Sequence, residues 1–352
     1  MAKSLSKLIV ILGPTASGKS ELVLKLAKKF DGEIVSADSR QIYEGMNIGT
    51  AKPPKNQESR IKNHEYTPRS RFKIYWYRGI AHYLVDIANP DKDFTLAQYK
   101  KLAIKVIRNI QKRGKVPFLV GGTGLYIKAV VDNFQIPKVK PNKKLRKKLE
   151  MLDMLKLQEL LKKLDPDAIK FIDIKNKRRV LRAIEVSKIT GKPFSSQRTI
   201  GKQIFDSLQI GIAVPKEKLQ KKIDKRVERM FKMGLIKEVL NLRKYYSPAL
   251  PSMNTIGYKE VNQYLNEAKT LITYGKSQGS DGMTRKTIPS NSVDIREIPS
   301  GIKELIKKNT FKYAKRQMTW FGKDKKIKWV DNYKRAEILV RGFITKPNKS
   351  YC

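Results

Sequence analysis

The stretch "KLIVILGPTASGKS" (residues 7–20) decides the fold of this 352-residue chain. Residues 7–12 form an apolar run, as expected of a strand that is buried on both faces of a parallel sheet. Residues 13–20 then match the phosphate-binding pattern G-x-x-x-x-G-K-[S/T] in full. The following "SELVLKLAKKF" has helical spacing, so the phosphate would lie at a helix N-terminus. The sequence therefore predicts a strand, a phosphate-binding loop and a helix in succession.

In most ATPases an aspartate at the end of a second strand works with this loop, and no such aspartate is found here. Lys19 would add a positive charge to the converging backbone N–H groups, and the Ser20 hydroxyl could reach Mg²⁺. A P-loop NTPase normally has a second apolar strand ending in an Asp that holds the metal. The best candidate, residues 116–120, is followed by "GGTG" and by no acid, whereas Asp38 follows an earlier strand. The loop can hold a phosphate chain, but a standard ATPase is not favoured.

The charge favours a polyanionic partner. Lys and Arg number 76 against 32 Asp and Glu, which gives a formal net charge of +44. A surplus this large is typical of proteins that bind nucleic acid, although a lysine-rich composition can also reflect an AT-rich genome or high solubility.

The sequence argues against disulfides, cysteine-based zinc sites, catalytic histidines and membrane insertion. The only cysteine is Cys352, so neither a disulfide within the chain nor a cysteine-based zinc site is expected. The two histidines, His64 and His82, are interpreted as packed or surface residues. The longest apolar runs are far below the ~20 residues of a membrane span. The N-terminal run begins the P-loop strand and is not read as a signal peptide, so we expect a cytoplasmic protein without a membrane partner.

Residues 7–130 alternate between strand and helix patterns, which predicts βαβ units and a parallel sheet. Residues 81–87 are interpreted as a strand. Residues 94–114 are interpreted as a helix that begins with a capping box formed by Thr95 and Gln98.

From about residue 137 the chain becomes basic and helical, and no strand pattern appears until residues 207–214. A helical insertion between two strands of the sheet explains this best. The predicted fold class is thus α/β: a P-loop NTPase-like parallel sheet flanked by helices, from residues 1–137 and 201–352, with an inserted helical domain over residues 138–200.

The remaining segments complete the predicted architecture. Residues 52–78 are interpreted as a long surface excursion and residues 273–301 as a mobile loop. Residues 311–322 predict a short basic-aromatic helix, and residues 326–331 a final strand. The residues before Gly234 predict another helix, which has an apolar face and ends at this glycine. Its opposite face carries four cations: Lys222, Lys225, Arg226 and Arg229.

Seven signatures occur in one order: "GPTASGKS", "SADSRQIYEGMNIGTAKP", "VGGTGLY", "KRRVLRAIEV", "RVERMFKMGL", "IGYKE" and "AKRQMTW". Together, and over nearly the whole chain, they resemble the tRNA dimethylallyltransferases (tRNA isopentenyltransferases) of bacterial type. The resemblance implies transfer of a dimethylallyl group from dimethylallyl diphosphate to N6 of the adenosine just 3′ of the anticodon (position 37), with Mg²⁺. It also implies that the inserted helical domain grips the anticodon stem-loop of the tRNA. The chain departs from the family at Gly322, where an arginine is common, and lacks the zinc finger of many eukaryotic members.

In this interpretation the P-loop holds the leaving group, so no acid is needed to activate a water. The resemblance implies catalytic roles for Asp38, which would take the N6 proton, for Thr123 near the reacting centre, and for Arg226 on the diphosphate. Asp38 could instead form a turn or cap a helix, and Arg226 could lie on a solvated helix face. The implied diphosphate-binding residues are Gly13, Pro14, Thr15, Ala16, Ser17, Gly18, Lys19 and Ser20, with Ser20 also next to the metal.

The resemblance also implies a set of tRNA contacts. Gln41 could recognise the adenine edge, and Gln317 belongs to the same C-terminal motif as two of the basic residues. We expect the protein to act as a monomer. The implied tRNA-binding residues are Asp38, Ser39, Arg40, Gln41, Thr123, Arg146, Arg178, Arg179, Arg182, Lys315 and Arg316.

Two other functions are compatible with parts of the sequence. A small-molecule or nucleotide kinase would bind ATP in the P-loop and use Asp38 to activate a hydroxyl, but the missing second acid and the +44 charge argue against it. A non-catalytic basic RNA-binding module would not need an intact Lys19, Ser20 and Asp38. Incubation with labelled dimethylallyl diphosphate or ATP, with and without unmodified tRNA, distinguishes a prenyltransferase, a kinase and an RNA-binding module.

Overall fold

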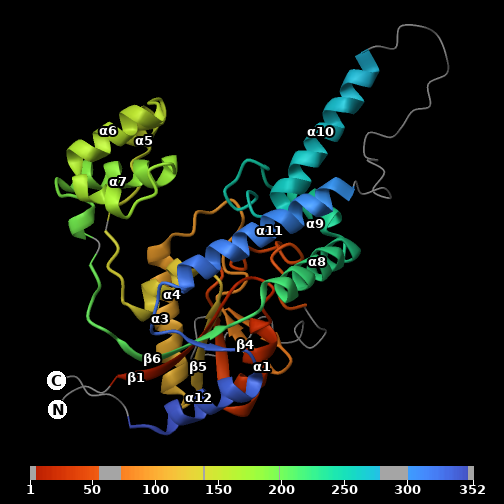
Figure 1. Ribbon diagram of the computed structural model, residues 1–352. Helices are drawn as coiled ribbons and strands as arrows, with labels where there is room; N and C mark the ends of the chain where they lie inside the picture. Colours follow the sequence, from red (N-terminus) through yellow and green to blue (C-terminus); the bar gives the residue numbers. More distant parts are fainter. Residues whose placement is uncertain (1–4, 55–72, 138, 198, 278–299, 348–352) are drawn as a thin grey trace. The chain divides into compact units, whose positions relative to one another are not determined.

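A mostly parallel seven-stranded sheet lies at the centre of the computed structural model, which describes residues 5–54, 73–137, 139–197, 199–277 and 300–347 (Figure 1). The strand order is β3-β4-β2-β5-β1-β6-β7, and β3 and β4 alone pair in antiparallel fashion among these seven. This confirms the predicted parallel sheet. The strands are β1 (Ser6–Leu12), β2 (Gly32–Ser36), β3 (Ile74–Tyr77), β4 (Ile80–Tyr83), β5 (Val116–Gly121), β6 (Phe205–Ile212) and β7 (Lys328–Val330).

The apolar run that opens the sequence becomes the central strand. β1 pairs with β5 on one side and with β6 on the other, and its last five residues are buried, as expected of a strand covered on both faces. Leu12 lies opposite Gly121 of β5, and Ser36 of β2 lies opposite Val120. The carboxyl ends of β1, β2 and β5 therefore meet at one edge of the sheet, where ligands of open α/β sheets bind.

Helices cover the sheet and its carboxyl edge. α1 and α12 share an apolar core with the strands, which includes Ile9, Ile11, Leu26 and Val340. No helix in the described part of the chain has both the length and the apolar character that a bilayer crossing requires. The helices before and after the inserted segment are α1 (Lys19–Lys29), α3 (Leu96–Lys112), α4 (Gly124–Val131), α8 (Lys216–Lys232), α9 (Leu235–Arg243), α10 (Tyr258–Ser277), α11 (Ser300–Phe321) and α12 (Tyr333–Thr345).

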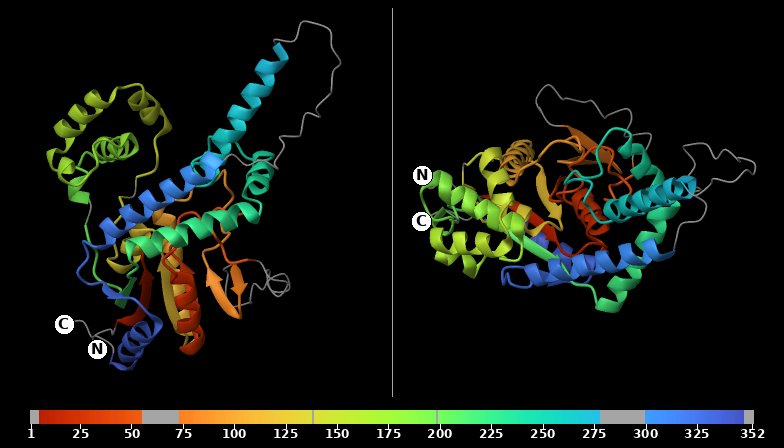
Figure 2. Two further views of the ribbon diagram at one scale, coloured as in Figure 1. Left: turned by 45° about the vertical axis from the view of Figure 1, so that its right-hand side comes forward. Right: turned by 90° about the horizontal axis from the view of Figure 1, so that it is seen from above.

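A second apolar core lies where α8, α9, α10 and α11 gather. Figure 2 shows α8 and α11 side by side above the sheet, and the two helices pack against each other. Their buried residues, such as Val227 and Ala314, join Ile42 and Met46 from the segment after β2. This core fixes two helices over the edge at which the P-loop lies.

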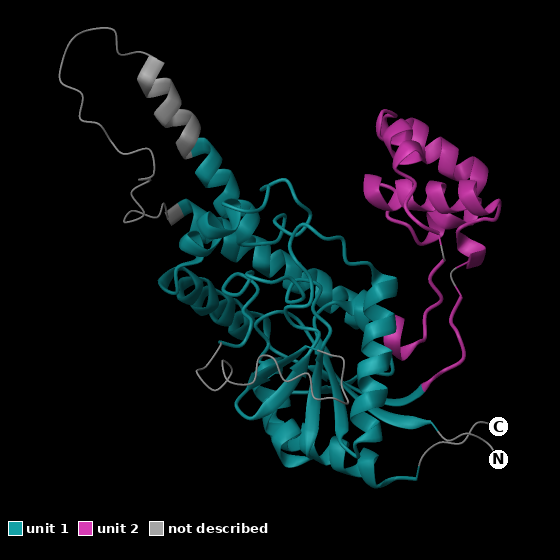
Figure 3. Cartoon of the chain, turned by 180° about the vertical axis from the view of Figure 1, so that it is seen from behind, with its two compact units in different colours: residues 1–127, 205–352 teal, residues 128–204 magenta. Residues whose placement is uncertain are grey.

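The chain divides into two compact units (Figure 3). Residues 1–127 and 205–352 form unit 1, and residues 128–204 form unit 2. Unit 2 consists of α5 (Lys143–Glu150), α6 (Met154–Leu164), the 3-10 helix η1 (Pro166–Lys170), α7 (Lys177–Thr190) and the 3-10 helix η2 (Ser195–Gln197). It has a hydrophobic core of its own: Leu149, Leu157, Leu161, Ala168, Ile172, Val180, Leu181, Ala183 and Ile184.

The helices of unit 2 start where the sequence provides N-caps. Asn142, Asp153 and Asn176 each accept a hydrogen bond from the backbone N–H three residues later, at the first turns of α5, α6 and α7. Such caps satisfy backbone donors that have no partner inside the helix. α7 ends at Gly191, whose φ of 67° is left-handed and suits a glycine.

A buried carboxylate joins α5 to α7. Glu185 is completely buried and accepts hydrogen bonds from Arg146 Nε and Nη2 (2.9 and 2.8 Å), from Arg182 Nη1 (2.6 Å) and from the Asn142 N–H (2.7 Å). Arg182 Nη2 also donates to the Val139 carbonyl. Burial alone would raise the pKa of Glu185, but the bonds from Arg146 and Arg182 hold it below its usual value.

The structure corrects several boundaries predicted from the sequence. The excursion over 52–78 contains strand β3, and only residues 55–72 lie outside the described residues. The strand predicted over 81–87 ends at Tyr83, because Leu84 and Asp86 have left-handed φ values of 62° and 52°.

Two segments are helical where a loop or a shorter helix was predicted. α10 continues through Ser277, so the loop predicted over 273–301 starts later, and residues 278–299 lie outside the described residues. The short helix predicted at 311–322 is the second half of the 22-residue α11. The predicted capping box is confirmed: Thr95 accepts from the Gln98 N–H, and the Gln98 side chain accepts from the Thr95 N–H.

We expect Glu185→Gln to destabilise the protein by roughly 1–3 kcal/mol, less than the loss of a fully buried ion pair because both arginines are partly exposed. Since the pKa of Glu185 is lowered by folding, its contribution is complete above its ordinary pKa of 4.5 and disappears as the pH falls through the folded value. Urea unfolding at neutral pH measures the loss. Glu159→Gln, on the exposed surface of α6, is the control; equal stability of the two variants would contradict the assignment.

Candidate active site

The loop after β1, residues 13–18, leads directly into α1. Gly13 and Gly18 have φ values of 145° and 99°, which side-chain-bearing residues rarely adopt. A Cβ on Gly13 would also come within 3.4 Å of the backbone of Ile212 at the end of β6. The predicted strand–loop–helix is thus present, and Gly18 forms the N-cap of α1 in the left-handed conformation.

Lys19 turns back over this loop. Its Nζ donates to the Pro14 carbonyl at 2.5 Å and lies 3.5 Å from the Ser17 hydroxyl. Burial lowers the pKa of Lys19 to about 7, opposed by the nearby carboxylate of Asp38 and assisted by the Arg226 guanidinium. The site therefore brings two basic side chains close together, and a bound anion would favour the charged form of Lys19.

Arg226 reaches the same loop from α8. Its Nη1 donates to the Thr15 hydroxyl at 2.9 Å. Burial lowers the pKa of Arg226, against the pull of Asp38, Tyr258 and Tyr313. The alternative of a solvated helix face is wrong for this residue, whereas Lys222, Lys225 and Arg229 on the same helix are exposed.

Asp38 lies just after β2. Its Oδ1 accepts the backbone N–H groups of Arg40 (2.8 Å) and Gln41 (3.4 Å), so it does form a turn. Within the described part of the chain, Oδ2 accepts no hydrogen bond. The turn therefore fixes the carboxylate by one oxygen and leaves the other available to a substrate proton.

Thr123 joins the loop after β5 to the loop after β2. Its Oγ1 accepts the Ser39 N–H at 3.1 Å and donates to the Ser39 hydroxyl at 3.4 Å, and its N–H donates to the Ala37 carbonyl. Tyr313 of α11 belongs to the same cluster. Burial and then Asp38 raise the pKa of Tyr313 to about 12, against a hydrogen bond with Thr123. Sequence reasoning missed Tyr313, although it stands four residues before Gln317 on the same helix.

Gln41 is hydrogen-bonded to the loop that carries the "GTAKP" signature. Its amide oxygen accepts from Ser36 Oγ at 3.3 Å, and its amide nitrogen donates to the carbonyls of Thr50 (3.3 Å) and Ala51 (3.4 Å). Its predicted contact with adenine stays a prediction, and any such contact would have to share the amide with these bonds.

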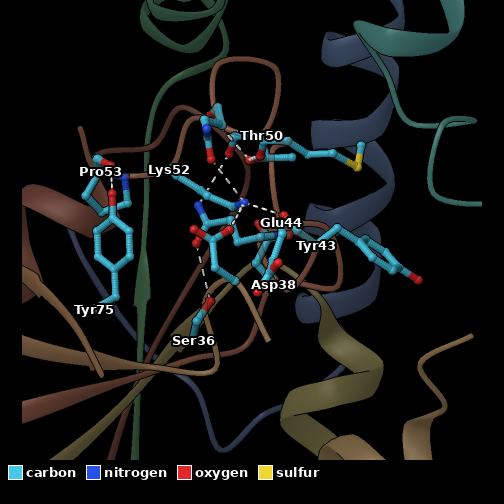
Figure 4. A network of polar contacts seen from close by, with 12 residues as sticks. Ser36, Asp38, Tyr43, Glu44, Thr50, Lys52, Pro53 and Tyr75 are labelled. Atoms are coloured by element: carbon cyan, nitrogen blue, oxygen red, sulfur yellow. Dashed lines mark hydrogen bonds and ion pairs between the residues drawn. The ribbon is translucent and has the colours of Figure 1, made fainter. Parts of the chain in front are cut away.

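Two charged residues support this loop. In Figure 4 Lys52 lies inside the network, where its Nζ bonds the Tyr43 carbonyl, Asn47 Oδ1 and the buried Asp86 carboxylate. Glu238 of α9 accepts the N–H groups of residues 47–49. Glu238 was not predicted, because it lies about 190 residues from the loop.

The predicted tRNA-binding residues fall into two sets. Lys315 and Arg316 are exposed on α11 of unit 1, and Arg40 Nη1 donates to the Pro251 carbonyl. On unit 2, Arg178 and Arg179 are exposed, whereas Arg146 and Arg182 bind Glu185.

The histidines take no part in this site as described. His82 is buried in β4 with its Nδ1 3.0 Å from the Ile80 carbonyl, and burial lowers its pKa to about 4, as expected of a packed residue. His64 lies outside the described residues.

Known proteins resemble this chain over nearly its full length. The model of the IPP transferase family matches residues 41–324, and that of the isopentenyl transferase family matches residues 6–69. The chain is 39% identical to the tRNA dimethylallyltransferase of Pelotomaculum thermopropionicum over 342 residues, covering 95% of this chain and 94% of that protein.

Two solved structures are also similar. One is the full-length tRNA isopentenylpyrophosphate transferase from Bacillus halodurans, with 31% identity, a TM-score of 0.60, and coverage of 96% of this chain and 95% of that one. The other is a eukaryotic dimethylallyltransferase acting on tRNA, with 26% identity, a TM-score of 0.72, and coverage of 98% and 81%.

Proposed function

Because the chain belongs to the IPP transferase family, we propose that it transfers the dimethylallyl group of dimethylallyl diphosphate to N6 of adenosine 37 in tRNAs. One observation carries this proposal. At the carboxyl edge of one sheet, Lys19 and Arg226 lie near Asp38. The two basic side chains can stabilise a departing diphosphate, and the carboxylate can accept a proton from an amine.

The donor diphosphate occupies the P-loop. The backbone of residues 13–20 and the Lys19 ammonium bind its oxygens, and Arg226 adds a second cation. As the bond between the allylic carbon and oxygen breaks, its electron pair stays on the diphosphate. The two cations stabilise this growing negative charge. Fixed charges that stabilise the charge developing in a transition state usually make the largest single contribution to catalysis.

The acceptor is the exocyclic N6 amine, a weak nucleophile. N6 forms a bond to the allylic carbon and loses one proton, which Asp38 accepts on Oδ2 while Oδ1 stays in the turn with Arg40 and Gln41. Thr123 and Ser39, which bond each other beside Asp38, hold the nucleotide near the reacting carbon. The Gln41 amide lies on the same side of the site and contributes to holding the nucleotide.

Mg²⁺ would accompany the diphosphate. Among the described residues, no three His, Cys, Asp or Glu side chains gather in a way that could hold a metal. Ser20, exposed at the first turn of α1, supplies one hydroxyl, and this single ligand fits an ion that is held mainly by phosphate oxygens and water. A bound ion would supply further charge neutralisation to the leaving group.

The basic residues bind the tRNA backbone. Unit 2 presents Arg178 and Arg179, and α11 presents Lys315 and Arg316. On unit 2, Glu185 compensates one of the two charges of Arg146 and Arg182, and these two arginines contribute an ordered surface there. The residues proposed for catalysis, Asp38, Thr123 and Arg226, all lie in unit 1, and we infer a monomer in the cytoplasm.

Asp38→Asn keeps the turn but cannot accept a proton. Turnover should fall by roughly 10²–10⁴-fold, the usual effect of losing a general base. Single-turnover transfer from labelled dimethylallyl diphosphate to unmodified tRNA measures it, with tRNA affinity unchanged. Asp91→Asn, on an exposed loop, is the control, and labelled ATP in place of the donor tests the kinase alternative. Near-normal turnover of Asp38→Asn would remove Asp38 from the role of base.

Donor binding should take up about one proton at pH 8–9, because a bound diphosphate raises the pKa of Lys19 from its value of about 7 in the free protein. Calorimetric titration in two buffers of different ionisation enthalpy measures the uptake. Lys19→Arg should abolish it, since arginine stays charged, and Lys25→Met on the exposed face of α1 should keep it. Identical heats in both buffers for the wild type would show that Lys19 is already charged.

Arg178→Ala combined with Arg179→Ala should weaken tRNA binding and make its salt dependence shallower, by about 0.9 in log–log slope for each lost phosphate contact. Filter binding at several salt concentrations gives both quantities. The matched control removes two exposed lysines of α1, Lys25→Ala with Lys28→Ala, and should change neither. The same slope in all three proteins would assign the tRNA surface to other residues.

A further inference from the structure

A single buried amide on α11 connects two loops of the active site. Gln317 is buried, with 7% of the residue's surface exposed. Its Oε1 accepts the Thr15 N–H at 2.8 Å, and its Nε2 donates to the Gly122 carbonyl, also at 2.8 Å. One bond therefore reaches the P-loop after β1, and the other reaches the diglycine loop after β5.

The diglycine loop is shaped to receive α11. A Cβ on Gly122 would lie 2.3 Å from Gln317 Nε2, and a Cβ on Gly124 would lie 2.2 Å from Trp320 Nε1. Both distances are below any real carbon contact, so a side chain at either position would displace the Gln317 amide or the Trp320 ring. The signatures "VGGTG" and "RQMTW" are thus two sides of one contact.

Thr15 is held from two helices at once. Gln317 of α11 accepts its N–H, and Arg226 of α8 donates to its hydroxyl at 2.9 Å. Without Gln317 the Thr15 N–H and the Gly122 carbonyl would both lose their partner in a largely buried place, which is costly for backbone groups. The Thr15 backbone would then lose its anchor to α11, and the hydrogen bond from Arg226 to the Thr15 hydroxyl would be less well fixed.

We propose that Gln317 is a positioning residue for the diphosphate donor, which locks the P-loop to the loop that carries Thr123. It does not touch the reacting atoms. It fixes Thr15, and through Thr15 the Arg226 guanidinium, relative to the Thr123 hydroxyl one residue beyond Gly122. This inference rests on the proposed function, since it assigns the P-loop to the donor diphosphate.

The geometry excludes a simple RNA contact for this side chain. Lys315 and Arg316, its neighbours on α11, are exposed, whereas both polar atoms of Gln317 are used inside the protein. Substitution should therefore act on donor binding and leave tRNA binding unchanged. A residue that served only the fold would lower stability without this selectivity.

The first test removes the amide. Gln317→Ala should raise the Kd of inorganic diphosphate and the KM of dimethylallyl diphosphate together, by about 10- to 100-fold, with the Kd of tRNA unchanged. Gln263→Ala, on the exposed face of α10 where the amide bonds only Glu267, is the matched control and should change nothing. Should Gln317→Ala not fold, Gln317→Met keeps the shape of the side chain and loses both bonds.

The second test reaches the same contact from the other side. Gly122→Ala should displace the Gln317 amide and reproduce the effect on diphosphate, and it should add little in the Gln317→Ala background, where the space is free. Additive losses, or an unchanged diphosphate Kd in both single variants, would overturn the proposal. A raised tRNA Kd alone would make Gln317 an RNA contact and overturn it equally. Failure of the wild type to bind diphosphate or to prenylate tRNA would instead refute the proposed function.

Discussion

The parallel pairing of β1 with β5, and of β5 with β2, is the constraint on which the rest of the structure depends. The register brings Leu12 opposite Gly121 and Ser36 opposite Val120, so three strands end at the same level. The P-loop, Asp38 and Thr123 each follow directly after one of these ends. Residues more than 80 apart in the chain can therefore bond each other, as Ser39 and Thr123 do. A shift of one strand by a residue would separate them.

The site is electrostatically incomplete without an anion. Lys19 and Arg226 are crowded around one loop, and burial lowers the pKa of both, while Asp38 alone among the largest influences on Lys19 acts in the opposite direction. Such an arrangement lowers the stability of the free protein, and the binding of a negatively charged ligand offsets this cost. The helices α8 and α11, which bring Arg226 and Gln317 to the loop, are held in place by an apolar core of their own.

Charge by itself did not distinguish the roles of the basic residues in unit 2. Four arginines looked equivalent in the sequence, yet two of them bind the buried Glu185 and two are exposed. A glutamate on the apolar side of α7 needs cationic partners, since an uncompensated buried carboxylate would be very unfavourable. Arg146 and Arg182 therefore serve the packing of α5 on α7, whatever further contact their outer edges make.

The sequence by itself determined the parallel sheet, the P-loop, the cap of α3 and the family, because these depend on local periodicity and on short patterns with a physical meaning. It also singled out Lys19, Asp38, Thr123 and Arg226, through motifs and not through any visible proximity. Only the tertiary structure decided that Arg226 faces the P-loop, that Gln317 bridges two loops, and that Glu238 holds residues 47–49. Each of these contacts joins residues at least 189 positions apart. No local propensity encodes such a contact, because it exists only after the strands and helices have packed.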